Sequence, residues 1–138
     1  GFNLPIGLIM RKMYGTFKEY HNSLDDENFI SFKRIIETIK IYYEVILSIE
    51  KNFTPISTIQ YGTPQLSKYG NDLYPEIMNF TDLKSKKESV RFILEILNLA
   101  EGNLDLLQIC EKKNFKLIEY FPVVEKMLKH KLIKKKFK

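Results

Sequence analysis

The sequence SKKESVRFILEILNLAEGN, residues 85–103, dictates how the carboxyl-terminal half of the chain folds. Ser85 and Glu88 have the spacing of a capping box, in which a hydroxyl and a carboxylate satisfy two free amide groups at the start of a helix. Apolar residues then recur every three or four positions, as on the buried face of an amphipathic helix. These residues are Val90, Ile93, Leu94 and Leu97. Gly102 is well placed to end the helix with a positive φ angle.

Two further helices are predicted after this one. Asn103 can cap the second helix, because its short side chain accepts hydrogen bonds from free amide groups. The apolar positions of the second helix are Leu104, Leu107, Ile109 and Cys110, and those of a third helix, between about Lys116 and His130, are Leu117, Phe121, Val124 and Leu128. Pro122 lies inside the third helix and has no amide donor, so this helix is either kinked or starts near Phe121.

A short basic strand completes this half of the chain. Leu132 and Ile133, followed by lysines, predict a strand that begins a wing. Three short helices followed by such a strand resemble a winged helix-turn-helix domain, which we place at residues 82–138.

The winged-helix resemblance leaves the kind of partner open, since this fold binds nucleic acids or proteins. Five lysines are placed to contact phosphates: Lys126, Lys129, Lys134, Lys135 and Lys136. No Arg, Asn or Gln lies in residues 116–131 to read base edges through paired hydrogen bonds. We therefore favour nucleic-acid binding without sequence preference, or none, over recognition of one DNA site. His130 lies between two lysines, surroundings that disfavour a bound cation.

Composition and charge narrow the class of protein. The chain has 44% hydrophobic and 28% charged residues, as globular proteins do, and its net charge of +5 comes from lysines after Glu125. Cys110 is the single cysteine, which excludes an internal disulfide and favours a small buried side chain. No apolar run approaches the ~20 residues of a membrane-spanning helix. We expect a cytoplasmic protein that does not associate with membranes.

The amino-terminal half reads as part of a second domain, residues 1–60, joined by a linker at residues 61–81. Residues 4–10 are mostly large and apolar and predict a buried strand. Asp25 or Asp26 can cap a helix that runs from about Asn28 to Glu50 and has a broad apolar face. Such a face must pack on something large, so an isolated piece exposes it or buries it in a neighbour. The chain begins at Gly1, without Met, so we expect a piece of a longer protein.

The loop of residues 19–26, EYHNSLDD, carries a candidate metal ligand. His21 follows an aromatic residue and precedes Asp25 by four positions, which resembles the last zinc-ligand loop of the M28-type zinc aminopeptidases. The flanking motifs of the resemblance recur in order: Leu4-Pro5-Ile6-Gly7, Arg11, Tyr14-Gly15 and, after the loop, Pro64-Gln65-Leu66. Together they resemble the carboxyl-terminal part of a bacterial M28-like zinc aminopeptidase family, with an aminopeptidase-like domain of the DUF4910 or DUF2172 type and a winged-helix tail.

This resemblance implies a mainly α fold with short strands (α+β), made of a fragment of an α/β aminopeptidase-like domain followed by the winged helix. It implies a full-length hydrolase with one or two zinc ions, acting on a peptide or an amide small molecule, in surface polysaccharide or related biosynthesis. His21 would be one ligand, Asp25 would support the ligand loop, and Arg11 would contact substrate. The remaining ligands and the general base would come from the missing amino-terminal part, so this chain alone would not catalyse.

Other interpretations remain for each of these residues. A lone histidine in a polar loop is most often simply solvated. Arg11 would, in that case, be a surface residue paired with Glu19 or Asp25. The whole chain would then be a regulatory or scaffolding module whose winged helix binds nucleic acid or protein. A homo-oligomer is compatible with either interpretation.

Overall fold

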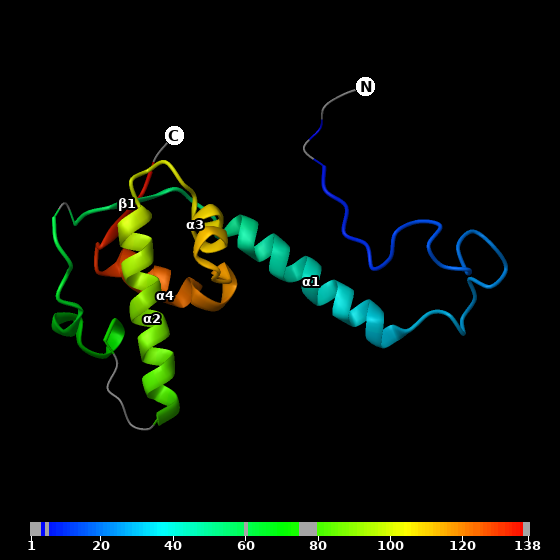
Figure 1. Cartoon of the computed structure of the whole chain (residues 1–138), viewed down its shortest axis with the longest axis horizontal. Helices are drawn as coiled ribbons and strands as arrows, with labels where there is room; N and C mark the ends of the chain where they lie inside the picture. The colour runs from blue at the N-terminus through cyan, green and yellow to red at the C-terminus, as the bar shows by residue number, and fades with distance from the viewer. Residues whose placement is uncertain (1–3, 5, 60, 75–79, 137–138) are drawn as a thin grey trace. The chain divides into compact units, whose positions relative to one another are not determined.

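The computed structural model describes residues 4, 6–59, 61–74 and 80–136 (Figure 1). It divides into two units, Gly1–Tyr42 and Tyr43–Lys138. Regular structure is mostly helical, with one two-stranded antiparallel sheet, which confirms the predicted α+β class. Among the described residues, none of the helices combines the length and the apolar character that a bilayer crossing requires.

Before helix α1, the first unit has no strand or helix among its described residues. The buried strand predicted over residues 4–10 is therefore wrong: the described side chains there are exposed, and Ile6 is 78% exposed. A strand needs a paired neighbour to satisfy its backbone groups, and apolar composition alone does not supply one.

Helix α1, Phe32–Glu50, starts later than predicted and ends where predicted. Asp26 caps a turn before the helix instead of the helix itself: its Oδ1 accepts from the backbone amides of Asn28 at 2.9 Å and Phe29 at 3.3 Å. Such a turn lets a carboxylate replace a backbone acceptor and delays the helix.

The broad apolar face of α1 is uncovered in the described structure. No α1 residue is buried, and Ile39, Tyr43 and Ile46 are each at least 60% exposed. This confirms the exposure expected for an isolated piece. A patch of this kind marks a surface that packs against something else.

A small sheet joins the two ends of the second unit. Strand β1, Pro55–Ser57, pairs antiparallel with β2, Ile133–Lys135, so that Pro55 lies opposite Lys135. The predicted wing strand is confirmed as β2, but its partner was expected to be an irregular connector within residues 1–60. The Ser57 amide also donates to the Ala100 carbonyl at 2.7 Å, which ties β1 to the loop after helix α2.

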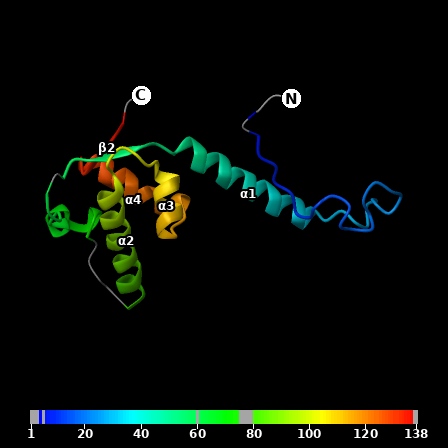
Figure 2. The ribbon, with the colours of Figure 1, turned by 45° about the horizontal axis from the view of Figure 1, so that its top comes forward.

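Helices α2 (Phe80–Leu99), α3 (Leu106–Lys113) and α4 (Leu117–Lys129) follow in the predicted order, and α2 packs against both others (Figure 2). Their predicted starts need correction. Ser85 lies inside α2, so the capping box predicted there is wrong. Asp105, not Asn103, caps α3: its carboxylate accepts from the Gln108 amide at 2.8 Å, and the Gln108 side chain accepts from the Asp105 amide. Helix α4 starts before Phe121 and contains Pro122.

The core of the second unit lies between one face of α2 and the other two helices. Its fully buried side chains include Phe92, Ile93, Ile96, Leu106, Ile109, Val124 and Met127. Of the predicted core face, Ile93 is fully buried and Val90 and Leu97 pack against the core, but Leu94 is 37% exposed. Cys110 is buried as predicted, and burial raises the pKa of its thiol to about 11.

Residues 61–74 of the predicted linker are held against the helices. They include a 3₁₀ segment, Leu66–Asp72, whose first residue, Leu66, is buried, as is Leu73, which follows the segment. The Asp72 carboxylate lies 2.6 Å from Lys129 Nζ and 2.7 Å from His130 Nε2. Hydrogen bonds from Lys129 and then His130 lower the pKa of Asp72 to about 2. Residues 75–79 lie outside the described part.

Asp72→Asn is expected to lower the thermal midpoint of the chain at neutral pH. The folded pKa of Asp72, about 2, lies below its ordinary value of 3.8, so its ionised form stabilises the fold above pH 3.8. That contribution is lost as the pH falls toward 2, so the difference between variant and parent midpoints should shrink over this range. Glu111→Gln, at an exposed position, is the control. A difference that stays constant down to pH 2 would contradict this assignment.

Gly102→Ala is expected to destabilise the second unit more than Gly62→Ala does. Both glycines have positive φ angles, 82° and 74°, where an added Cβ costs about 1–2 kcal/mol. Only at Gly102 would the new Cβ also meet a neighbour, Ile56 Cγ1 at 3.1 Å. Urea unfolding of the two variants measures the backbone cost that they share and the additional steric cost at Gly102. Equal unfolding midpoints would show that Ile56 moves away freely.

Candidate functional site

His21 lies in an exposed loop with its imidazole stacked on Tyr20, at 4.2 Å between ring centroids and 18° between planes. Its φ angle of 54° is left-handed, which costs a non-glycine residue about 1–2 kcal/mol. Asn22 holds the loop: its amide donates to the Lys18 carbonyl at 2.6 Å, and its Oδ1 accepts from the Leu24 amide at 2.9 Å. No hydrogen bond joins the His21 ring nitrogens to any described residue, so they remain available as donors to a metal.

The predicted supporting residue Asp25 is exposed and makes no side-chain contact with His21 in the described structure. Its backbone amide donates to the Asn22 carbonyl at 3.1 Å, so it belongs to the same loop. Within the described residues, no three His, Cys, Asp or Glu side chains gather as a set able to hold a metal ion. His21 therefore fits a metal as one ligand only, and its role with Asp25 stays a prediction.

A series of packed rings connects the His21 loop to a cavity. Tyr20 meets Phe17 edge-on at 5.6 Å, and Phe17 stacks on Phe29 at 6.0 Å with an interplanar angle of 18°. Phe17 and Phe29 line a cavity of about 610 Å³. Its other lining residues are Arg11, Lys12, Ser31 and Arg34. Sequence motifs predicted roles for Arg11 and His21 but not for the aromatic residues that link them.

Arg11 is anchored to α1. Its Nε donates to Thr38 Oγ1 at 3.0 Å, and its Nη2 donates to the Arg34 carbonyl at 2.9 Å and to Glu37 Oε2 at 3.0 Å. The carboxylate partner of Arg11 is therefore Glu37, and not Glu19 or Asp25 as the surface interpretation expected.

Glu37 gathers two arginines on one oxygen. Arg34 Nη1 and Arg11 Nη2 each lie 3.0 Å from Glu37 Oε2. The hydrogen bonds from Arg34 and from Arg11 lower the pKa of Glu37, so its carboxylate is ionised at neutral pH. One negative charge therefore positions two positive ones beside the cavity.

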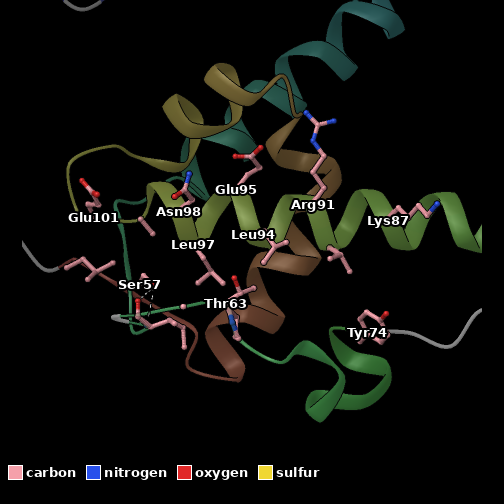
Figure 3. Close-up of a pocket in the computed structure, with 16 residues that line it drawn as sticks. Ser57, Thr63, Tyr74, Lys87, Arg91, Leu94, Glu95, Leu97, Asn98 and Glu101 are labelled. Carbon is pink, nitrogen blue, oxygen red and sulfur yellow. Dashed lines mark hydrogen bonds between the residues drawn. The ribbon is translucent and has the colours of Figure 1, made fainter.

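The second unit has a larger hollow, of about 1000 Å³, along the outer face of α2 (Figure 3). Leu94 and Leu97 point from α2 toward the segment that carries Ser57 and Thr63. Leu97 is half-buried and packs against the core as predicted, whereas Leu94, predicted to face the core, is exposed; both line the groove. Charged and polar side chains, among them Lys87, Arg91 and Glu95, line the groove beside these leucines, so it is a candidate surface for binding a partner with both apolar and polar groups.

Most of the five predicted phosphate-contacting lysines are engaged within the second unit. Lys129 pairs with Asp72, Lys136 Nζ donates to the Gly102 carbonyl at 2.8 Å, and Lys135 Nζ lies 5.1 Å from the centre of the Phe53 ring. Lys126 is half-buried, and Lys134 is exposed on β2. Three of the five thus have neighbours in their own chain that compete with a phosphate.

The segment between α1 and β1 covers part of the helix-turn-helix. The Phe53 carbonyl accepts from the Leu106 amide at 3.0 Å, and Asn52 Oδ1 accepts from the Leu107 amide at 3.2 Å. Lys51 Nζ lies 3.9 Å from the centre of the Phe121 ring on α4. The first turn of α3 and one side of α4 are therefore occupied by residues 51–53.

Comparison with known proteins divides the chain near this same segment. Residues 1–52 match the model of a domain of unknown function, DUF4910, and residues 54–135 match the model of a winged helix-turn-helix family. The chain is 34% identical, over 87% of its length, to a Clostridium acetobutylicum protein provisionally named as a polysaccharide biosynthesis protein with an aminopeptidase-like domain.

A solved structure extends this likeness to three dimensions. A crystal structure provisionally named as a peptidase from Clostridium acetobutylicum superposes on 92% of the chain with a TM-score of 0.70 and 25% identity. The chain spans about a quarter of the length of both relatives, 27% of the first and 26% of the second. These matches confirm the resemblance predicted from the sequence: the chain belongs to the winged helix-turn-helix family through residues 54–135, and a DUF4910 segment at residues 1–52 precedes that domain.

Proposed function

We propose that this chain is the carboxyl-terminal part of a zinc-dependent, aminopeptidase-like hydrolase. Two observations together carry the proposal. The DUF4910 match ends at residue 52, just after α1, and nothing in the described structure covers the apolar face of α1. A helix of this kind is expected to pack on the rest of its domain. Relatives about four times as long, one of them named for an aminopeptidase-like domain, supply a domain of suitable size.

In the complete protein, His21 would donate one ring nitrogen to zinc. The exposed imidazole, stacked on Tyr20 and otherwise without hydrogen bonds to described residues, supports this role. A bound zinc ion would supply Lewis acidity and an activated water for attack on an amide carbonyl. The other ligands and the general base would come from the rest of the aminopeptidase-like domain. Asp25 would orient the His21 loop, and Arg11, held by Glu37, would bind an anionic group of the substrate.

The same comparison supports a proposal for the substrate class. An aminopeptidase-like site acts on a peptide or on an amide of a small molecule. The name of the relative at 34% identity favours an amide formed during polysaccharide biosynthesis over a general peptide substrate.

His21→Ala is expected to remove zinc from the protein that carries this chain together with the rest of its aminopeptidase-like domain. An open catalytic zinc site has three protein ligands, so loss of one abolishes stable binding and turnover. His130→Ala is the matched control, because this second histidine contacts Asp72 in the winged-helix unit. Metal analysis and hydrolysis of an aminoacyl amide measure both effects.

Asp25→Asn in the same protein should weaken zinc binding about 10–100-fold, as loss of a supporting carboxylate does. Asp26→Asn is its neighbour control, because Asp26 caps the turn before α1.

Unchanged zinc content in His21→Ala would show that His21 is not a zinc ligand, and the interpretation of the chain as a binding module would remain.

For residues 54–135, we propose an attachment module that binds protein. Lys129, Lys135 and Lys136 are engaged within the unit, and residues 51–53 lie over part of α3 and α4. The groove along α2 instead offers apolar side chains together with charges of both signs, Lys87 and Arg91 beside Glu95 and Glu101. Both features favour a protein over a DNA duplex.

Mobility-shift assays with duplex DNA are expected to show only weak retardation that disappears as salt rises. Lys134→Gln should reduce this retardation, because Lys134 is an exposed lysine on the wing strand, whereas Lys136→Gln should change it less, because Lys136 donates to Gly102. A shift that depends on DNA sequence and persists at physiological salt would contradict the attachment role.

A further inference from the structure

We propose that the cavity lined by Arg11, Lys12, Phe17, Phe29, Ser31 and Arg34 binds the phosphate group of a small molecule whose remaining part lies on the two phenyl rings. The site stands on the geometry of the first unit. Only one part of this proposal rests on the proposed hydrolase function: the identification of the bound molecule as the substrate.

Charge selects a phosphate over a singly charged group. Arg11, Lys12 and Arg34 bring three positive charges to the cavity, and no carboxylate is among its described lining residues. Glu37 neutralises one of these charges, through the single oxygen that both arginines share. The remaining excess of about two charges matches a phosphate monoester, which carries close to two negative charges at neutral pH. Guanidinium groups also present paired donors that suit phosphate oxygens.

The arginine donors are already ordered. Three hydrogen bonds to successive acceptors on α1 fix the Arg11 guanidinium, and they leave its Nη1 without a partner among the described residues. Arg34 donates from Nη1 to Glu37, so its Nε and Nη2 remain available to donate to a ligand. A ligand that binds here does not have to immobilise these side chains, which removes part of the entropic cost of binding.

Size and wall chemistry favour a molecule larger than phosphate itself. A cavity of about 610 Å³ lies within the usual range of small-molecule sites. Phe17 and Phe29 form an apolar wall, and Ser31 adds a hydroxyl that can donate to a phosphate oxygen. The ligand therefore combines a phosphate with a flat or apolar portion.

Contacts between aromatic rings link the wall of the cavity to the His21 loop. Phe17 contacts Phe29 in the cavity wall and Tyr20 outside it, and Tyr20 stacks on His21. A phosphate held by Arg11 and Arg34 would thus anchor one end of the molecule within the packed rings that also position the predicted metal ligand.

The test is a zinc-free titration of the protein that carries this chain together with the rest of its aminopeptidase-like domain, with phenyl phosphate, inorganic phosphate and benzoate at low ionic strength, followed by calorimetry and by NMR of the phenylalanine rings. Phenyl phosphate is expected to bind most tightly, with shifts at Phe17 and Phe29. Arg11→Gln and Arg34→Gln should each weaken it about 10-fold or more, the usual effect of removing a charged hydrogen bond. Arg91→Gln, which removes a guanidinium from the other unit, should leave binding unchanged.

Lys12→Gln keeps the test decisive if loss of Arg11 disorders the segment. Lys12 makes no hydrogen bond to α1 among the described residues, and its Nζ lies 5.9 Å from the centre of the Phe17 ring, so its replacement removes a charge and one weak ring contact but no hydrogen-bonded anchor. A several-fold loss of phenyl phosphate affinity is expected. Equal affinity for benzoate and phenyl phosphate, or binding unaffected by Lys12→Gln and Arg34→Gln, would overturn the proposal. The titration contains no zinc and measures no hydrolysis, so absence of phosphate binding would not contradict the hydrolase proposal. Absence of zinc binding would likewise not contradict the phosphate site.

Discussion

Burial of Phe92, Ile93 and Ile96 on one side of α2 is the constraint on which the second unit depends. Each of these side chains is fully buried, which contributes about 1.5–3 kcal/mol per residue against an exposed state. Phe92 also stacks on Tyr120 at 4.7 Å and meets Phe115 edge-on at 5.1 Å, so the same residue fixes the loop between α3 and α4. Val90 and Leu97 pack against the edge of that core, and Leu94 is left exposed. The groove along α2 is therefore a consequence of how the core is built.

The first unit is organised by polar contacts more than by burial. Arg11 and Arg34 converge on Glu37, and Asn22 and Asp26 close successive turns of the preceding loop. Its large apolar side chains remain on the surface of α1. Hydrogen bonds and ion pairs, more than apolar burial, therefore hold the described part of this unit together.

Periodicity in the sequence predicted the three carboxyl-terminal helices and the final strand, because these elements depend on the spacing of apolar residues close together in the chain. It missed β1, since Pro55–Ser57 is too short to show alternation and becomes a strand only through pairing with β2. It also placed Leu94 in the core beside Ile93, although tertiary packing buries Ile93 and leaves Leu94 exposed. In the site, His21 and Arg11 were identified from motifs. Arg34 and Phe29 were missed, although the Arg34–Glu37 spacing on one helix face was a visible signal of an ion pair.

The pairing of β1 with β2 has a mechanical consequence. Pro55 lies opposite Lys135, so the chain enters and leaves the second unit at the same end of the sheet. Tension applied between these two points peels the short ladder apart one hydrogen bond after another, because the bonds run along the direction of pull. The winged helix would thus yield at low force when its ends are drawn apart, while pulling on residues 43–50 alone would first load the amide contacts of Asn52 and Phe53 with α3.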